Sequence, residues 1–247
     1  MPSDSFLPTL AQRNHLRLWL SATIGFLLLG FMALPLDVTL AAWVSQGHVP
    51  DVVGDVLDRA ESFAHGIGIA MILLVIYVID VRRRWTAPRV LLAVIGGGMA
   101  ANIIKLTIYR LRPGSFDLAK EVGESFQGWL PLFAVENSGR STPSAHTAAV
   151  VALAIALSWL YPRGRWLFAT LAVLGGLQRV SSSSHFLSDV FWGAAVGWFI
   201  AQGVISGWLT GPRLLRWENR KRALACQSSG LGDGEKDHGE QNEPRAA

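Results

Sequence analysis

The sequence of 247 residues has little charge and almost no cysteine. Only 16% of the residues are Asp, Glu, Lys or Arg, which excludes a highly charged disordered protein. The net charge of +4 is too small to indicate a nucleic-acid partner, and we expect none. The single cysteine, Cys226, excludes an intramolecular disulfide bond and a cysteine-based metal or cluster site.

Hydrophobic residues, by contrast, make up 51% of the chain and form long runs without charged side chains. A helix needs about 20 largely apolar residues to cross a bilayer core of roughly 30 Å. Six runs are candidates, two of them only if the helix continues past a single cationic residue, Lys105 or Arg179. The runs are 18–36, 62–79, 90–104, 141–162, 166–178 and 190–212. The sequence therefore predicts an all-α bundle of six transmembrane helices.

The distribution of basic residues predicts how this bundle is oriented. Lys and Arg residues in short loops favour the cytoplasmic side of a membrane. In the six-span arrangement thirteen of them lie on one side and seven on the other; the thirteen fall within 13–17, 82–89, 163–165 and 213–222. The sequence therefore predicts a multi-pass protein of the cell (inner) membrane with both termini in the cytoplasm.

Two segments outside the spans differ from the spans in composition. Residues 37–61 lie on the predicted outer side, and within them Asp51, Asp55, Asp58 and Glu61 alternate with apolar residues at helical spacing. This pattern predicts an amphipathic helix at the membrane interface, where a structural cap is a simpler role than a substrate gate. We expect residues 1–225 to form one membrane-embedded domain and residues 226–247 to form a disordered cytoplasmic tail.

Ionisable residues at or inside the ends of apolar spans are unusual, because placing one at mid-membrane raises the free energy by roughly 2.5 to 3.5 kcal/mol. Their presence therefore indicates a specific role. Three groups stand out, and in the six-span arrangement all of them lie on the outer side. They are Lys105 with Arg112-Pro113, the string Pro143-Ser144-Ala145-His146, and Arg179 with His185 and Asp189. One small region at the outer face is therefore expected to hold them together.

These residue types suit the chemistry of a phosphate ester. Two arginines and a lysine at one point repel each other unless an anion lies between them, and guanidinium groups fit tetrahedral oxyanions. Two histidines can supply a nucleophile or base and an acid. Asp189 follows His185 by four residues, so on one helix it can hold one imidazole nitrogen and leave the other to attack phosphorus. Ser144 and nearby backbone N–H groups offer donors at a helix N-terminus.

Each group taken alone has a simpler explanation. Lys105 and Arg112 are typical of side chains that extend to the membrane surface. His146 is compatible with an interfacial histidine bonded to a backbone carbonyl, and His185 with Asp189 is compatible with a structural pair that caps the last span. The hypothesis of a site therefore depends on the occurrence of all three groups, in order, in one chain.

The three strings resemble the signature motifs of the type-2 phosphatidic acid phosphatase family, which are integral-membrane lipid phosphate phosphatases. The resemblance, including the helix pattern, extends over about residues 62–207. Two positions depart from the family pattern: Ala145 replaces the usual Gly, and Gln178 replaces the usual Ser before Arg179. Ala145 still offers its backbone N–H, and the Gln178 amide can still donate a hydrogen bond.

The resemblance implies hydrolysis of a phosphate monoester or diphosphate on a membrane lipid, without metal or cofactor, through a phosphohistidine intermediate. It assigns the nucleophile to His185, its orientation to Asp189 and proton donation to His146. It assigns phosphate binding to Lys105, Arg112, Ser144 and Arg179. The candidate substrates are lipid A, undecaprenyl diphosphate, phosphatidic acid and phosphatidylglycerol phosphate, and the partners implied are this lipid and the bilayer. The oligomeric state is not indicated.

Three other classes of protein are compatible with part of this sequence pattern. Vanadate-dependent haloperoxidases carry the same motifs but are soluble, whereas six apolar spans would leave a very large exposed patch in water. A transporter or scaffold that only binds a lipid phosphate has no need of the pair His185 and Asp189. A phosphotransferase that passes the phosphoryl group to a second lipid stays open, since the sequence does not identify the acceptor.

Overall fold

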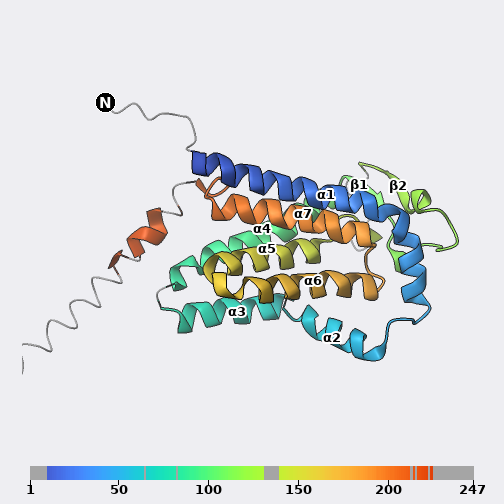
Figure 1. Cartoon of the computed structure of the whole chain (residues 1–247), viewed down its shortest axis with the longest axis horizontal. Coiled ribbons are helices and arrows are strands. Elements are labelled where there is room, and N and C mark those ends of the chain that lie inside the picture. Colours follow the sequence, from blue (N-terminus) through green and yellow to red (C-terminus); the bar gives the residue numbers. More distant parts are fainter. Residues whose placement is uncertain are drawn as a thin grey trace, which may run out of the picture.

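A computed structural model describes residues 10–63, 65–81, 83–130, 139–211, 214, 216–221 and 223–224, with side chains from residue 17 onwards. The chain is mostly helical, and its long helices run side by side along one axis (Figure 1). The long helices are α1 (Leu10–Ser45), α3 (Gly66–Ile79), α4 (Ala87–Lys105), α5 (Ala145–Leu160), α6 (Arg165–Ser181) and α7 (Leu187–Ile205). The shorter helix α2 (Asp51–Glu61) packs against α6 at the end of the bundle away from the N-terminus.

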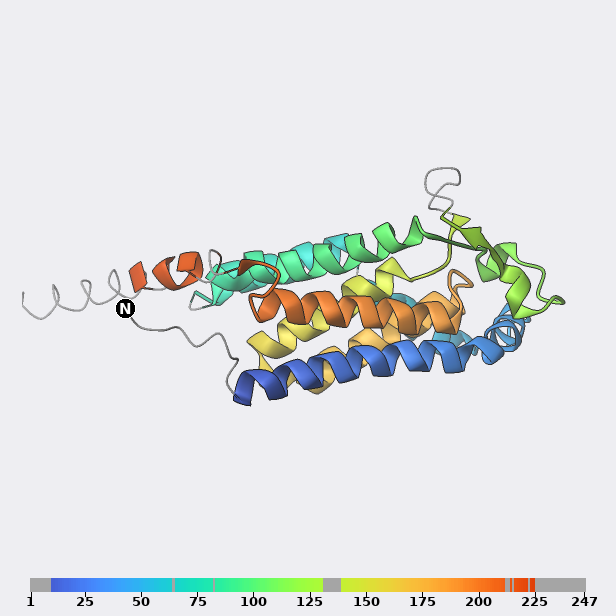
Figure 2. The same cartoon turned by 90° about the horizontal axis from the view of Figure 1, so that it is seen from above.

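A small antiparallel sheet lies between α4 and α5 in sequence, at the same end of the bundle (Figure 2). It pairs β1 (Ile108–Arg110) with β2 (Phe126–Trp129). The expectation of a purely α-helical chain therefore omitted one element, which the aromatic and β-branched residues of these strands favour. Single 3-10 turns complete the loops, at Arg84–Thr86, Pro113–Ser115, Val122–Ser125 and Pro162–Gly164.

Helix α5 is the centre of the bundle and packs against α4, α6 and α7. Glycines on α7 allow this close approach, because a Cβ atom added at Gly193 would lie 2.4 Å from the carbonyl oxygen of Ser144. A Cβ atom added at Gly197 would lie 2.2 Å from the carbonyl oxygen of Ala148. Small residues four apart are the usual way for membrane helices to bring their backbones together. Here they place the start of α7 directly against the start of α5.

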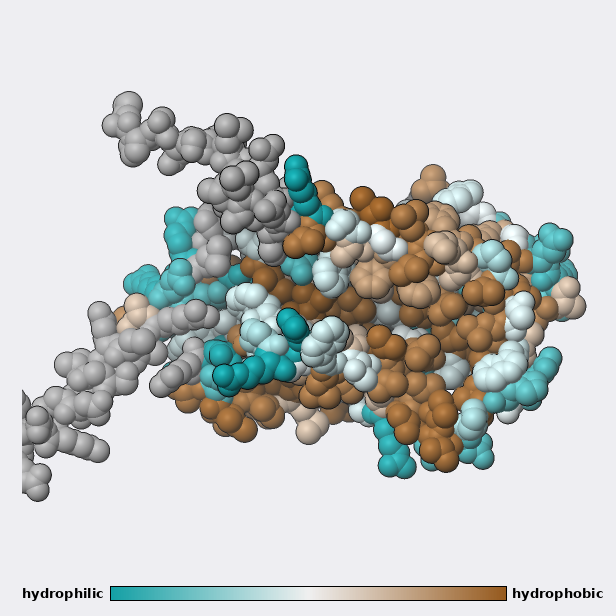
Figure 3. All heavy atoms as spheres, viewed as in Figure 1, coloured by the Kyte–Doolittle hydropathy of each residue, from teal (hydrophilic) through white to brown (hydrophobic). Residues whose placement is uncertain are grey.

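The outer surface of the helices is strongly apolar, as the brown side chains in Figure 3 show. In the described part of the chain, three helical segments are long and apolar enough to cross a membrane: Arg17–Ser45, Arg84–Lys105 and Leu187–Ile205. A fourth is added if α2 and α3 count as one bent span. These are features of a membrane protein. Since α3, α5 and α6 have only 14, 16 and 17 residues, the six crossings stay a prediction.

The predicted boundaries differ from the structure mainly in residues 37–61. The amphipathic helix is shorter than expected, because α1 continues to Ser45 and α2 begins only at Asp51. Helix α1 continues past Asp37 because this carboxylate is buried and paired with Arg110, so it does not require a loop at the surface. The predicted tail, residues 226–247, lies outside the described residues, and the single domain over residues 1–225 stays a prediction.

Candidate active site

The three groups of polar residues meet at one end of the bundle, where α4 and α6 end and α5 and α7 begin. Lys105 is the last residue of α4, and His146 is the second residue of α5. Arg179 lies in the last turn of α6, and Asp189 lies in the first turn of α7. Because these helices alternate in direction, segments far apart in the sequence come together at this end of the bundle.

Asp189 is completely buried and accepts four hydrogen bonds. Its Oδ1 atom accepts from Nη1 of Arg110 at 2.7 Å and from the hydroxyl of Thr142. Its Oδ2 atom accepts from the hydroxyl of Ser141 and from the backbone N–H of Phe186 at 3.0 Å. A buried carboxylate is stable only when it is paired and fully hydrogen-bonded, and this one is held in a single orientation.

Arg110 connects this carboxylate to α1. Its Nη2 atom donates to Oδ2 of Asp37 at 2.7 Å, and its Nε atom donates to Oγ of Ser125 at 3.0 Å. Neither Arg110 nor Asp37 belongs to the three groups of residues from which the site was predicted. The available signal was the position of Asp37 directly after an apolar run, since a carboxylate there requires a cationic partner.

His185 lies just outside α7, in the segment that leads into it. Its Nδ1 atom is 3.4 Å from Oγ of Ser141, whose hydroxyl donates to Asp189. Within the described residues no hydrogen bond joins His185 directly to Asp189, so the arrangement differs from the expected direct contact. The reason is that α7 begins only at Leu187, and Asp189 turns back to bond the N–H of Phe186. Ser141 therefore lies between the carboxylate and the imidazole.

The environment of His185 favours the neutral imidazole. Burial is the main cause that lowers the pKa of His185, to about 3, and the positive charges of Lys105, Arg112 and Arg179 act in the same direction. The negative charge of Asp189 opposes them. At neutral pH the ring therefore keeps an unprotonated nitrogen, which is the form that a nucleophile requires.

Two of the three cations around His185 have no carboxylate partner among the described residues, whereas the third, Arg179, is paired with Glu61. In the part of the chain that the structure describes, neither Lys105 nor Arg112 forms an ion pair, although Lys105 is only 4% exposed. The Nε atom of Arg112 donates to the carbonyl oxygen of Arg140 at 3.4 Å. Burial and the neighbouring Arg179 lower the pKa of Arg112. Such a group of cations is stabilised by an anion that binds between them.

The start of α5 adds neutral groups to this end of the bundle. Ser144 is the N-cap, and its Oγ atom accepts hydrogen bonds from the N–H and the hydroxyl of Thr147 at 3.3 and 2.9 Å. The hydroxyl proton of Ser144 is therefore free for a further acceptor. The Nε2 atom of His146 is buried and has no hydrogen-bond partner in the described residues. The same residues contain no group of three or more His, Cys, Asp or Glu side chains that could hold a metal ion.

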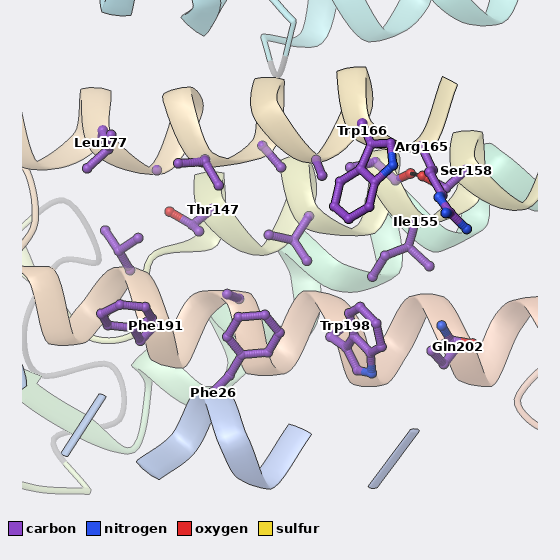
Figure 4. A pocket seen from close by; sticks show the side chains of 18 of the residues that line it. Phe26, Thr147, Ile155, Ser158, Arg165, Trp166, Leu177, Phe191, Trp198 and Gln202 are labelled. Carbon is purple, nitrogen blue, oxygen red and sulfur yellow. Dashed lines mark hydrogen bonds between the residues drawn. The ribbon is translucent and has the colours of Figure 1, made fainter. Parts of the chain in front are cut away.

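An apolar groove of about 710 Å³ lies between α6 and α7, with α5 beneath it (Figure 4). Thr147, near the start of α5, and Leu187, the first residue of α7, line the groove close to the residues described above. Trp166 and Gln202, which are labelled in Figure 4, line it near the start of α6 and the end of α7. Thr147 donates a hydrogen bond to Ser144, so the groove begins next to the predicted phosphate ligands. Most of the side chains that line it are apolar.

Sequence and structure comparisons with known proteins both match the family that the three motifs resemble. The family model described as the PAP2 superfamily matches residues 87–212, which include all three groups of polar residues. The lipid A 1-phosphatases of Rhizobium johnstonii and Rhizobium etli are each 33% identical to the chain over 117 residues. This aligned stretch is 47% of the chain and 45% and 47% of those two proteins. The chain thus spans about half the length of the curated relatives it matches.

Two solved structures resemble the fold. The crystal structure of Aquifex aeolicus LpxE has a TM-score of 0.51 and 19% identity, and covers 69% of this chain and 95% of its own. A transmembrane PAP2-type phosphatidylglycerolphosphate phosphatase from Bacillus subtilis has a TM-score of 0.55 and 18% identity, and covers 77% of this chain and 94% of its own. At these identities the likeness concerns the fold alone.

Proposed function

The chain belongs to the PAP2 superfamily, and on this premise we propose that it is a metal-independent phosphatase that acts on a membrane lipid. It hydrolyses a phosphate monoester or diphosphate at the end of the bundle where α5 and α7 begin. The observation that carries this proposal is a neutral, buried His185 near Lys105 and Arg112, neither of which has a carboxylate partner in the described residues. A nucleophile beside an anion site with free positive charge suits phosphoryl transfer.

The reaction has two steps. In the first, a nitrogen of His185 attacks phosphorus, the P–N bond forms, and the P–O bond to the lipid breaks while His146 protonates the departing oxygen. In the second, His146 takes a proton from water, the water oxygen attacks phosphorus, and the P–N bond breaks to release phosphate and restore His185. Asp189 orients His185 through Ser141. The nonbridging oxygens, where negative charge accumulates, are bound by Lys105, Arg112, Ser144 and Arg179.

Among the candidate substrates we favour lipid A, because the relatives that the chain matches are lipid A 1-phosphatases. Undecaprenyl diphosphate, phosphatidic acid and phosphatidylglycerol phosphate offer the same phosphate chemistry and differ in the group that leaves. The apolar groove beside Thr147 supports a substrate with long hydrocarbon chains over a water-soluble phosphate ester.

The direct test is phosphate release by the full chain, purified in detergent, from each of these four lipids with and without a chelator. We expect release from at least one lipid, fastest from lipid A, at a rate that the chelator does not change. Mass spectrometry of the lipid products checks whether the phosphoryl group passes to water or to a second lipid. Absence of release from all four lipids, or a strict need for an added divalent metal, would contradict the proposal.

The groove gives a second prediction, for the replacement Val173→Trp. Val173 lines the groove and is 60% exposed, so a larger ring fits there without disturbing the core. We expect the KM for dimyristoyl phosphatidic acid to rise about tenfold, which corresponds to the loss of about two buried methylene groups. The KM for dihexanoyl phosphatidic acid should stay unchanged, because its acyl chains are much shorter. Kinetics with the two chain lengths measure the difference.

The matched control is Val78→Trp on α3, because Val78 is 62% exposed and does not line the groove. This variant should treat both chain lengths as the wild type does. An equal effect of the two tryptophan variants on the long-chain substrate would show that the groove does not bind the hydrocarbon chain.

We further propose six crossings of the inner membrane, with α2 at the interface, the active site on the outer (periplasmic) face and both termini in the cytoplasm. The argument is that basic loop residues collect at the end of the bundle away from the site, among them Arg83, Arg84 and Arg163. Cysteine labelling tests this orientation and needs an exposed position in the predicted outer loop. Ser125 in this loop is fully buried and therefore unsuitable, whereas the side chain of Lys120 is about half exposed.

In a Cys226→Ser background, Lys120→Cys should react with a membrane-impermeant maleimide added to intact spheroplasts, and Arg163→Cys should react only after lysis. Both cysteines are in loops at opposite ends of the same bundle, so each is the control for the other. The reverse labelling pattern would invert the proposed orientation.

A further inference from the structure

The guanidinium group of Arg179 is held along one edge. Its Nε atom donates to Oε1 of Gln178 at 2.6 Å, and its Nη2 atom donates to the same oxygen and to the carboxylate of Glu61. The remaining nitrogen, Nη1, forms no hydrogen bond with any residue that the structure describes. Two of the three guanidinium nitrogens are therefore committed to the protein, and one is left for a ligand.

Gln178 is itself anchored from the other side. It is only 4% exposed, and its Nε2 atom donates to Oδ1 of Asp58 at 3.1 Å. Neighbouring residues on a helix do not face each other, so the contact of Gln178 with Arg179 requires that the amide be held in place. Asp58 and Glu61 both belong to α2, which packs against α6. Helix α2 thus supplies both carboxylates in this arrangement, Asp58 for Gln178 and Glu61 for Arg179.

Without such support Arg179 would not stay near the other cations. An arginine side chain has considerable rotamer freedom, and the positive charge of Arg112 repels it. A guanidinium that is already oriented loses little freedom when a phosphate binds, whereas a mobile one must be ordered at the expense of affinity. The negative charge of Glu61 and the amide oxygen of Gln178 fix the group before a ligand arrives.

We propose that Glu61 and Gln178 are positioning residues, which hold Arg179 by its Nε and Nη2 edge so that Nη1 binds the phosphate of the substrate. This inference rests on the proposed phosphatase function and adds to it a role for α2 in building the site. Gln178 is also one of the two positions where this chain departs from the usual family pattern, and its amide is the group that donates to Asp58.

The test compares Glu61→Leu and Gln178→Leu with the conservative variant Glu61→Gln, using the full chain in detergent. The two leucine variants should lower kcat/KM for the lipid phosphate about tenfold to a hundredfold, mainly through KM, since each removes an acceptor from a charged donor. Glu61→Gln keeps an oxygen that accepts from Nη2 and should stay close to wild type. Asp55 lies on the same helix and forms no hydrogen bond or ion pair with Arg179 among the described residues, so Asp55→Leu is the control for damage to α2.

Binding of orthovanadate, measured by calorimetry, gives a readout that does not depend on turnover. Its Kd should rise by the same factor in the two leucine variants and stay unchanged in Glu61→Gln and Asp55→Leu. Unchanged vanadate affinity in Glu61→Leu and Gln178→Leu would overturn the inference and leave the phosphatase proposal intact. A wild-type chain that binds vanadate but releases no lipid phosphate would overturn only the proposed function, while one that binds no vanadate would overturn both.

Discussion

Replacement of His185 by alanine is expected to lower kcat for lipid phosphate hydrolysis by about ten-thousand-fold or more, the scale of losing the nucleophile in covalent catalysis. The expectation follows from its burial, its neutral imidazole and its place near Lys105, Arg112 and Arg179. Among the histidines whose side chains the structure describes, only His185 is buried. Steady-state phosphate release measures the effect.

The control for this prediction is His48→Ala, because His48 is an exposed histidine that stacks on Trp43 outside the site. That variant should keep the wild-type rate. Acid-labile, alkali-stable labelling of the protein by radioactive lipid phosphate should appear in the wild type and be absent in His185→Ala. Undiminished turnover of His185→Ala would refute the assignment of the nucleophile.

Replacement of Arg110 by leucine is expected to lower the free energy of unfolding by about 3 to 5 kcal/mol, because it leaves two buried carboxylates without a cation. Arg110 is fully buried and forms ion pairs of 2.7 Å with both Asp37 and Asp189. Proteins have only about 5 to 15 kcal/mol of stability in total, so this loss also reduces the yield of folded protein. Thermal unfolding in detergent measures it.

The partner variant Asp37→Asn removes one of the two carboxylates and should restore part of the stability when it is combined with Arg110→Leu. The two changes are therefore expected to be non-additive, as for residues within one hydrogen-bonded network. Asp37→Asn alone keeps the bond between Arg110 and Asp189 and should retain phosphatase activity. An Arg110→Leu variant as stable as the wild type would show that this network does not hold α1 to the site.

Several parts of the fold could be predicted from short stretches of sequence. Each of the six apolar runs overlaps one helix, α1 or α3 to α7, since a helix in lipid needs a continuous apolar surface that is visible residue by residue. The ends differ: α1 extends to Ser45 beyond the run 18–36, and α7 ends at Ile205 within the run 190–212. The string Pro143-Ser144-Ala145-His146 coincides with the N-terminus of α5, where Ser144 is the cap. Local composition determines these features, so no long-range contact is needed to predict them.

The hairpin of β1 and β2 and the continuation of α1 to Ser45 were not predicted, because both depend on partners distant in sequence. Arg110 lies 73 residues from Asp37 and 79 residues from Asp189. The expected direct contact of Asp189 with His185 was based on helical spacing, which fails because the helix begins two residues after His185. Only packing decides that Ser141 occupies the space between them.

The family, the approximate positions of the helices and the charged residues that need a common partner can all be identified from the order of the amino acids. Their order and spacing are properties of the chain and require no coordinates. Which charged groups neutralise one another depends on the packing of the helices. Arg110 is paired with Asp37 and Asp189, and Arg179 is paired with Glu61, whereas Lys105 and Arg112 have no carboxylate partner in the described residues. A buried charge is stable only beside a specific counter-charge, and the contacts between helices that are distant in sequence determine which counter-charge lies there.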